Sequence, residues 1–240
     1  MLAAIRTIIF VALSFLLTVV YGLSSFFLGA FSQVARHRFI ISWCTLVIGL
    51  ARWVCGIRYQ VIGREHLKEL QGPVVVMSKH QSTWETLYLQ ILFFPASTIL
   101  KKSLLDLPFF GWGLRALRPI GIDRSNPRDA LRQLRIGGEQ GIKENLNILI
   151  FPEGTRMLPG ERGKYARSGA DIAIASNVKV VPVAMNAGEC WLGDSKPRLP
   201  GLVTVHIGAP IDPTGKTSRE LTEEVETWIE TAMQQLPPAR

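Results

Sequence analysis

A strand, a polar loop and a helix follow one another in VVVMSKHQSTWETLYLQILFF, residues 74–94. Residues 74–77 form an unbroken apolar run, which indicates a buried strand, and residues 84–93 have the composition of a helix. Strands that alternate with helices imply a sheet covered by helices. The loop between the two elements leaves the carboxyl end of the strand, where open α/β sheets bind their ligands.

The same alternation continues along the chain after residue 57. We expect strands and helices from their β-rich runs and helical patterns. The expected strands are 59–62, 74–77, 98–100, 148–151, 179–183 and 203–207, and the expected helices are 84–93, 103–117, 127–145, 166–176 and 218–235. No repeat, low-complexity tract or linker divides this part, so we expect residues 57–240 to form one α/β domain.

The first 56 residues are more apolar than the rest. Residues 7–31 contain no charged residue, and at about 1.5 Å per residue they can cross a hydrocarbon core of about 30 Å. This run is longer than the apolar part of a cleaved signal peptide, about 7 to 15 residues. The apolar run 39–51 is too short to cross, which predicts an interfacial or re-entrant helix and a hairpin that dips into one leaflet.

Aromatic and basic residues flank the second apolar run. We expect Trp43 and Trp53 to anchor at the membrane interface, with Arg52 and the basic cluster Arg36–Arg38, which includes His37, at the level of the headgroups. By the positive-inside rule this cluster places the following chain on the cytoplasmic side of the membrane.

The formal net charge is +8, and residues 101–167 hold much of it, with 13 Lys and Arg against 7 Asp and Glu. No nucleic-acid-binding signature accompanies this charge, and no aromatic residues are interleaved as a stacking platform requires. Beside a membrane segment, an anionic membrane surface and its phospholipids are the expected partners. The three cysteines are too scattered for a disulfide framework or a zinc site, so we expect a reducing compartment.

Two interpretations are open for His80 and Glu85. Ser82-x-x-Glu85 fits a capping box, in which the glutamate serves only the first turn of the helix. Alternatively, His80 in the loop folds back onto Glu85, which accepts from Nδ1–H, fixes the tautomer and leaves Nε2 as a base.

Two further stretches carry candidate binding residues. ILIFPEGTRM, residues 148–157, is a strand that ends at Pro152 and places Arg156, a bidentate clamp for phosphate, just beyond it. In residues 99–127, Lys101 and Arg124 each follow a short apolar run and offer further phosphate contacts. Surface charges are the alternative interpretation of all three residues. The stretch GWGLRA, residues 111–116, matches a dinucleotide fingerprint, but no strand leads directly into it.

These stretches, in this order, resemble the motifs of the glycerolipid acyltransferase family, and more closely those of the bacterial 1-acyl-sn-glycerol-3-phosphate acyltransferases. The family patterns are H-x4-D, K-x-x-L-x-x-x-P-x-x-G followed by I-D-R, F-P-E-G-T-R and V-P-V. Their counterparts here are His80 to Glu85; Lys101, Leu104, Pro108, Gly111 and 122–124; 151–156; and 181–183. Glu85 replaces the usual aspartate, and Lys79 stands where asparagine is common.

The resemblance implies a mixed, mostly parallel sheet flanked by helices in a catalytic domain, residues 57–240, behind a membrane-anchoring segment, residues 1–56. It implies acyl transfer from acyl-CoA or acyl-carrier protein to the sn-2 hydroxyl of lysophosphatidic acid, without a cofactor or metal. The product is phosphatidic acid, made on the cytoplasmic side of the inner membrane. The aromatic stretch 107–112 would line the acyl chain, unless these side chains are core.

The resemblance also implies residue roles. His80 is the general base and Glu85 holds its imidazolium. The substrate-binding residues implied are Lys101, Arg124, Glu153, Gly154, Thr155 and Arg156. Three alternatives remain: another lysolipid acceptor, such as a lyso-aminolipid or a larger headgroup; a non-enzymatic protein that binds anionic lipid; and a covalent acyl-enzyme, which the absence of a G-x-S-x-G elbow disfavours.

Overall fold

The computed structural model describes residues 1–123, 126–193 and 196–240, with only the backbone of Glu69 and Pro127. A seven-stranded sheet in these residues has the order β1-β7-β6-β2-β5-β3-β4. Its strands are β1 Ile57–Ile62, β2 Val75–Ser78, β3 Ala96–Lys101, β4 Ile120–Ile122, β5 Asn147–Ile150, β6 Val180–Met185 and β7 Gly201–Ile207. The pair β6 and β7 is antiparallel and the other neighbours are parallel, which confirms a mixed, mostly parallel sheet.

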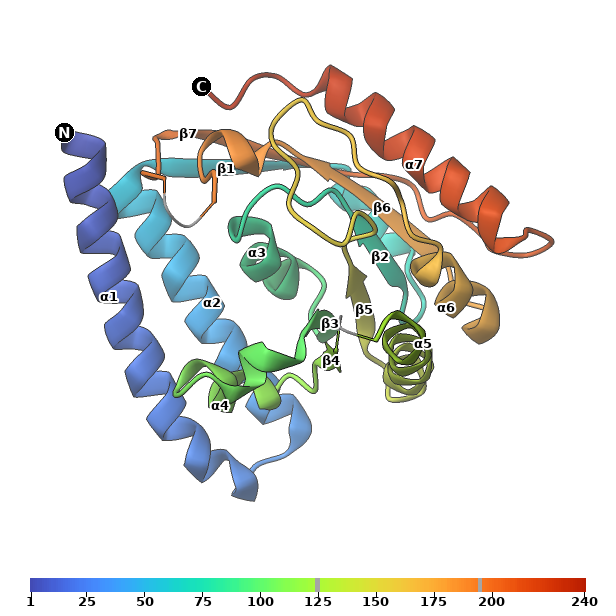
Figure 1. The fold of residues 1–240 in the computed structure, drawn as a ribbon, viewed down its shortest axis with the longest axis horizontal. Coiled ribbons are helices and arrows are strands. Elements are labelled where there is room, and N and C mark those ends of the chain that lie inside the picture. Colours follow the sequence, from blue (N-terminus) through green and yellow to red (C-terminus); the bar gives the residue numbers. More distant parts are fainter. Residues whose placement is uncertain (124–125, 194–195) are drawn as a thin grey trace.

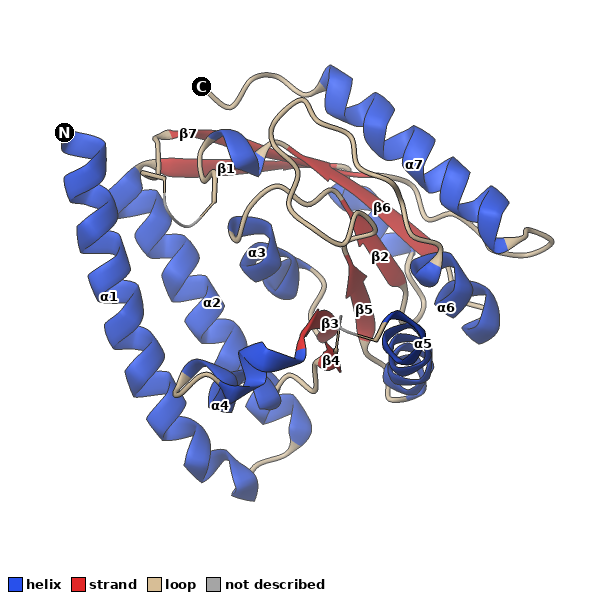
Figure 2. Cartoon of the chain, viewed as in Figure 1, coloured by secondary structure: helices blue, strands red, loops and turns tan. Residues whose placement is uncertain are grey.

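Helices cover both faces of this sheet (Figures 1 and 2). Four helices lie on one side: α1 Leu2–Ser24, α2 Gln33–Cys55, α3 Trp84–Leu92 and α4 Phe110–Arg115. Three lie on the other: α5 Pro127–Lys143, α6 Ser168–Ser176 and α7 Ser218–Gln235. Short 3₁₀ turns complete the described elements: η1 Ser25–Ala30, η2 Arg64–Glu69, η3 Lys102–Asp106 and η4 Ala187–Glu189.

Strand β2 shows why the sheet is buried on both faces. Its four residues are buried, and successive side chains point to opposite faces of a strand. Val76 belongs to the hydrophobic cluster on the α2 and α3 side, whereas Val75 and Met77 belong to the cluster under α5, α6 and α7. An unbroken apolar run is therefore what this central parallel strand requires.

The segment between β3 and β4 differs from the prediction of one helix over residues 103–117. It contains the 3₁₀ turn η3, which ends at Asp106, and the short helix α4, which begins at Phe110. Pro108 separates them because a proline inside a helix removes a hydrogen bond and clashes with the preceding turn. Phe109 has a positive φ of 61°, which completes the break. Strand β4 was not among the predicted strands.

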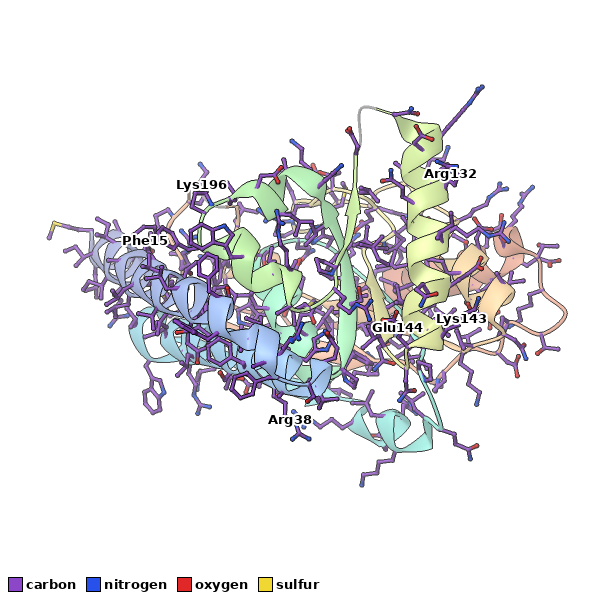
Figure 3. The ribbon with its side chains drawn as sticks, turned by 90° about the horizontal axis from the view of Figure 1, so that it is seen from below. Phe15, Arg38, Arg132, Lys143, Glu144 and Lys196 are labelled. Atoms are coloured by element: carbon purple, nitrogen blue, oxygen red, sulfur yellow. The ribbon has the colours of Figure 1, made fainter. Side chains whose placement is uncertain are left out.

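The N-terminal segment is a pair of long helices. Leu2–Ala30 and Gln33–Cys55 are each long and apolar enough to cross a membrane, by length and composition. Phe15 on α1 is 65% exposed, and its side chain lies on the outer surface (Figure 3). Ile8 on the same helix is 68% exposed. Such an apolar surface indicates membrane association.

The prediction that residues 39–51 make a short helix was wrong, because α2 has 23 residues. The helix begins where the Ser32 side chain accepts from the Ala35 N–H, and it ends at Gly56, whose φ is 75°. The cap at Ser32 and the left-handed Gly56 set these limits. The arginines that flank the apolar run 39–51 therefore lie inside the helix and do not end it.

Two residues of α2 lie elsewhere than expected. His37 is buried rather than at headgroup level, and its Nε2 lies 3.2 Å from the Leu117 carbonyl oxygen. Trp43 is half-buried against Phe110 rather than free to anchor at an interface, whereas Trp53 is 82% exposed. Both corrections arise because α2 packs on the domain.

Candidate active site

The parallel strands β2, β5 and β3 bring three candidate stretches to one edge of the sheet. Met77 and Ile150 are paired near the carboxyl ends of β2 and β5. Because neighbouring strands lie about 4.8 Å apart, the loops that follow, residues 79–83 and 151–157, lie beside each other. Strand β3, on the other side of β5, ends at Lys101.

His80 and Glu85 form the pair that the sequence motif predicts. The His80 Nδ1 lies 3.0 Å from Glu85 Oε1, and the Glu85 side chain is fully buried. The same oxygen accepts from the backbone N–H groups of Gln81 at 2.6 Å and Ser82 at 2.5 Å. The longer glutamate therefore reaches the ring, and one carboxylate both orients the histidine and binds the turn that precedes α3.

This geometry fixes the role of each imidazole nitrogen. A carboxylate oxygen can only accept here, so Nδ1–H donates a hydrogen bond to Glu85. The lone pair of the neutral ring therefore lies on Nε2. The His80 side chain is 14% exposed, which leaves the ring accessible from one side. Phe151 supports the other side, with ring centroids 4.2 Å apart and planes inclined by 24°.

The turn that contains Glu153 holds the His80 backbone at both ends. Glu153 Oε2 accepts from the His80 N–H at 2.9 Å, and the Met157 N–H donates to the His80 carbonyl at 2.8 Å. The Glu153 side chain is fully buried. Its carboxylate therefore faces the protein interior and binds the loop of His80. Any effect of Glu153 on substrate binding must pass through that loop.

The other expected binding residues lie at the same edge but in solvent. Lys101, Thr155 and Arg156 are exposed, and Arg124 lies outside the described residues. Gly154 has a φ of 69°, a conformation that glycine adopts without strain and that turns the chain after Glu153. Exposed cations at the same edge of the sheet as a partly exposed imidazole are suited to an anionic ligand with a reactive hydroxyl.

A scan of family models matches residues 58–186 to the acyltransferase model. That match covers more than half of the chain and includes both loops just described. The chain belongs to the acyltransferase family. A 1-acyl-sn-glycerol-3-phosphate acyltransferase of Pseudomonas aeruginosa is 42% identical to it over 240 residues, which cover 98% of this chain and 93% of that protein.

More distant proteins agree with this assignment. The human 1-acyl-sn-glycerol-3-phosphate acyltransferase beta is 26% identical over 81% of this chain and 69% of its own. The crystal structure of the 1-acyl-sn-glycerophosphate acyltransferase PlsC from Thermotoga maritima matches 97% of this chain and 95% of its own with a TM-score of 0.80. At 22% identity that likeness shows a shared fold.

The aromatic stretch of the acyltransferase packs against its N-terminal helices. Trp112 contacts Phe26, and Phe110 contacts Trp43. The cavity that Phe109 and Phe110 line between α1, α2 and α4 measures about 20 Å³. Ligand pockets measure about 300 to 1,000 Å³, so in this conformation the cavity holds no acyl chain. Phe109, Phe110 and Trp112 are half-buried here, and the lining of an acyl chain by this stretch stays a prediction.

Burial disfavours cysteine chemistry in the described part of the acyltransferase. Cys190 is buried, and burial together with the nearby Glu189 carboxylate raises the pKa of its thiol to about 11. At neutral pH such a thiol is protonated and a poor nucleophile. No group of three His, Cys, Asp or Glu side chains among the described residues is placed to bind a metal ion.

The sequence did not reveal the residues that support the acyltransferase site from inside. Buried Lys79 and Tyr165 and half-buried Glu230 form a polar cluster behind His80. A lysine that directly follows a buried apolar strand was the one available signal, because such a residue must find a partner when it is buried. Its partner on α7 could not be inferred.

Proposed function

We propose that this acyltransferase transfers a fatty acyl group from a thioester to the sn-2 hydroxyl of 1-acyl-sn-glycerol-3-phosphate and so makes phosphatidic acid. The observation that carries the proposal is His80, held through Nδ1 by buried Glu85, at the sheet edge where Lys101 and Arg156 are exposed. The 42% identity with the 1-acyl-sn-glycerol-3-phosphate acyltransferase of Pseudomonas aeruginosa supports the proposal.

His80 acts in this reaction as a general base. Its Nε2 takes the sn-2 hydroxyl proton while the oxygen attacks the thioester carbonyl, so that the new ester C–O bond forms as the C–S bond breaks. The imidazolium then gives this proton to the thiolate, which leaves as a thiol. Acyl-CoA or acyl-carrier protein is the donor substrate, and the reaction needs no cofactor. Glu85 stabilises the imidazolium that forms in between.

Lys101, Arg156 and Arg124 would bind the phosphomonoester, with Gly154 and Thr155 shaping the turn around it. We expect Arg156→Ala to lower kcat/KM for lysophosphatidic acid about 10- to 100-fold, mainly through KM, because a hydrogen bond to a charged group contributes about 1.5–3 kcal/mol. Arg156→Ala should acylate monoacylglycerol, which lacks the phosphate, at the same slow rate as the wild type does.

The control for Arg156 is Arg219→Ala on α7, where the guanidinium pairs with Glu223 on the surface. That variant should keep kcat/KM within twofold. Equal losses for the two acceptors in Arg156→Ala would contradict a phosphate-binding role.

The N-terminal helices would hold the catalytic domain at the cytoplasmic face of the inner membrane. Arg36 and Arg38 follow α1, and positive residues of this kind stay on the cytoplasmic side. Helices α1 and α2 pack against each other, and the exposed apolar side chains of α1 would lie along one leaflet next to anionic lipid. In that orientation the site would lie beside its lysolipid substrate.

The departures at Lys79 and Glu85 favour one further candidate, the same chemistry on a different lysolipid. An acceptor panel tests the choice: purified enzyme receives acyl-CoA with lysophosphatidic acid, lysophosphatidylcholine or a lyso-aminolipid, and released thiol is measured. We expect turnover with lysophosphatidic acid to be at least about tenfold faster. Faster turnover of another acceptor would overturn the substrate, and thiol release with none of them would leave a lipid-binding protein.

A further inference from the structure

Lys79 is a buried cation next to the catalytic histidine. It is 1% exposed, and its ammonium has three donors that each meet an acceptor. Nζ lies 2.7 Å from Glu153 Oε1, 2.9 Å from the Glu161 carbonyl oxygen and 2.9 Å from Glu230 Oε1. A lysine so placed has no remaining donor for a substrate, so its role must be exerted through these partners.

The partners connect three separate parts of the chain. Glu153 follows β5, Glu161 belongs to the loop of residues 157–167, and Glu230 lies on α7. Tyr165 from the same loop donates to Glu230 Oε1 at 2.8 Å. One ammonium therefore binds the loop and the C-terminal helix to the turn beside the active site.

The link to His80 is short and passes through one residue. Glu153 Oε1 accepts from Lys79, while Oε2 of the same carboxylate accepts from the His80 N–H at 2.9 Å. Without Lys79 the fully buried Glu153 carboxylate would lack its counter-ion, and a buried unpaired charge moves to water or takes up a proton. Either change loosens its hold on the His80 backbone.

We propose that Lys79 is a positioning residue of the acyltransferase, which sets the His80 loop through Glu153 and couples helix α7 to that loop through Glu230. This inference rests on the proposed function. It goes beyond the motif residues. Lys79 stands where asparagine is common, and its partner Glu230 lies 151 residues away in the chain.

The effect should appear in kcat rather than in substrate binding. Misplacing a catalytic group by about 1 Å can slow a reaction about 10²-fold. Lys79→Met keeps an unbranched side chain that is one atom shorter and removes the charge. We expect it to lower kcat about 30- to 100-fold while KM for lysophosphatidic acid changes less than threefold, since the exposed cations remain.

The experiment compares Lys79→Met, Glu230→Gln and Glu226→Gln in the full chain, with thiol release from acyl-CoA and lysophosphatidic acid at temperatures below each melting transition. Glu226 is the matched control, one turn before Glu230 on α7, and it pairs with Arg162 of the same loop on the surface at 2.7 Å. Glu226→Gln should keep kcat within twofold.

Glu230→Gln preserves the contact of Lys79 with Glu153, so we expect a smaller loss in kcat, about 3- to 10-fold. This variant also decides the matter if Lys79→Met does not fold. A kcat for Lys79→Met within threefold of wild type would overturn the proposal. So would a loss confined to KM, or equal kcat values for Glu230→Gln and Glu226→Gln. Inactive wild-type enzyme would instead refute the proposed function.

Discussion

Replacement of His80 by alanine is expected to lower kcat about 10³-fold with lysophosphatidic acid and acyl-CoA. A positioned general base contributes about 10²- to 10⁴-fold, and alanine leaves no group near the hydroxyl to take its proton. KM should change little, because in the proposed site Arg156 and Lys101 would bind the phosphate independently of the ring. Thiol release under saturating substrates measures kcat directly.

His206→Ala is the matched control for this variant. His206 is a half-buried histidine on β7, which β6 separates from β2, and its ring centroid lies 5.1 Å from that of Trp228 on α7. We expect His206→Ala to retain wild-type kcat. Turnover by a folded His80→Ala enzyme at the wild-type rate would end the assignment of His80 as the base.

Glu85→Gln is expected to lower kcat about 10²- to 10³-fold in a protein that still folds. Glutamine can keep an acceptor oxygen toward the Gln81 and Ser82 N–H groups, which the carboxylate now binds. It removes the negative charge that, in the proposed mechanism, stabilises the imidazolium during proton transfer, and its amide group can also hold the wrong tautomer of the ring. The melting temperature and kcat therefore separate the two roles of this residue.

Glu220→Gln provides the comparison for Glu85. Glu220 accepts from the Thr217 N–H in the capping box of α7, so it has the capping role without the histidine. Because capping boxes accept glutamine, we expect unchanged kcat and little change in melting temperature. If Glu85→Gln behaved in the same way, Glu85 would be a helix cap only.

Much of the fold follows from local sequence patterns. Strands β2, β5 and β6 have unbroken apolar runs because helices cover both faces of the sheet, so these runs predict buried strands. Helix α7 is predicted by its helical pattern. The breaks near Pro108 and the full length of α2 were missed. Those boundaries depend on how the segments pack on each other, which periodicity alone does not record.

The site was predictable to the extent that it is local. His80 and Glu85 are five residues apart, so their contact follows from a loop that meets the first turn of a helix. The contact of Lys79 with Glu230 joins β2 to α7, and no local pattern specifies it. Likewise, the sequence placed Glu153 at the substrate pocket, whereas its carboxylate faces inward to the backbone of His80.

The most direct test of the catalytic arrangement is a crystal structure of the enzyme with lysophosphatidic acid and no acyl donor. We expect the sn-2 oxygen about 2.6–3.2 Å from His80 Nε2, the distance that proton transfer requires, and the phosphate on the guanidinium of Arg156. A phosphate bound away from the carboxyl ends of β2 and β5, with the sn-2 hydroxyl out of reach of His80, would contradict it.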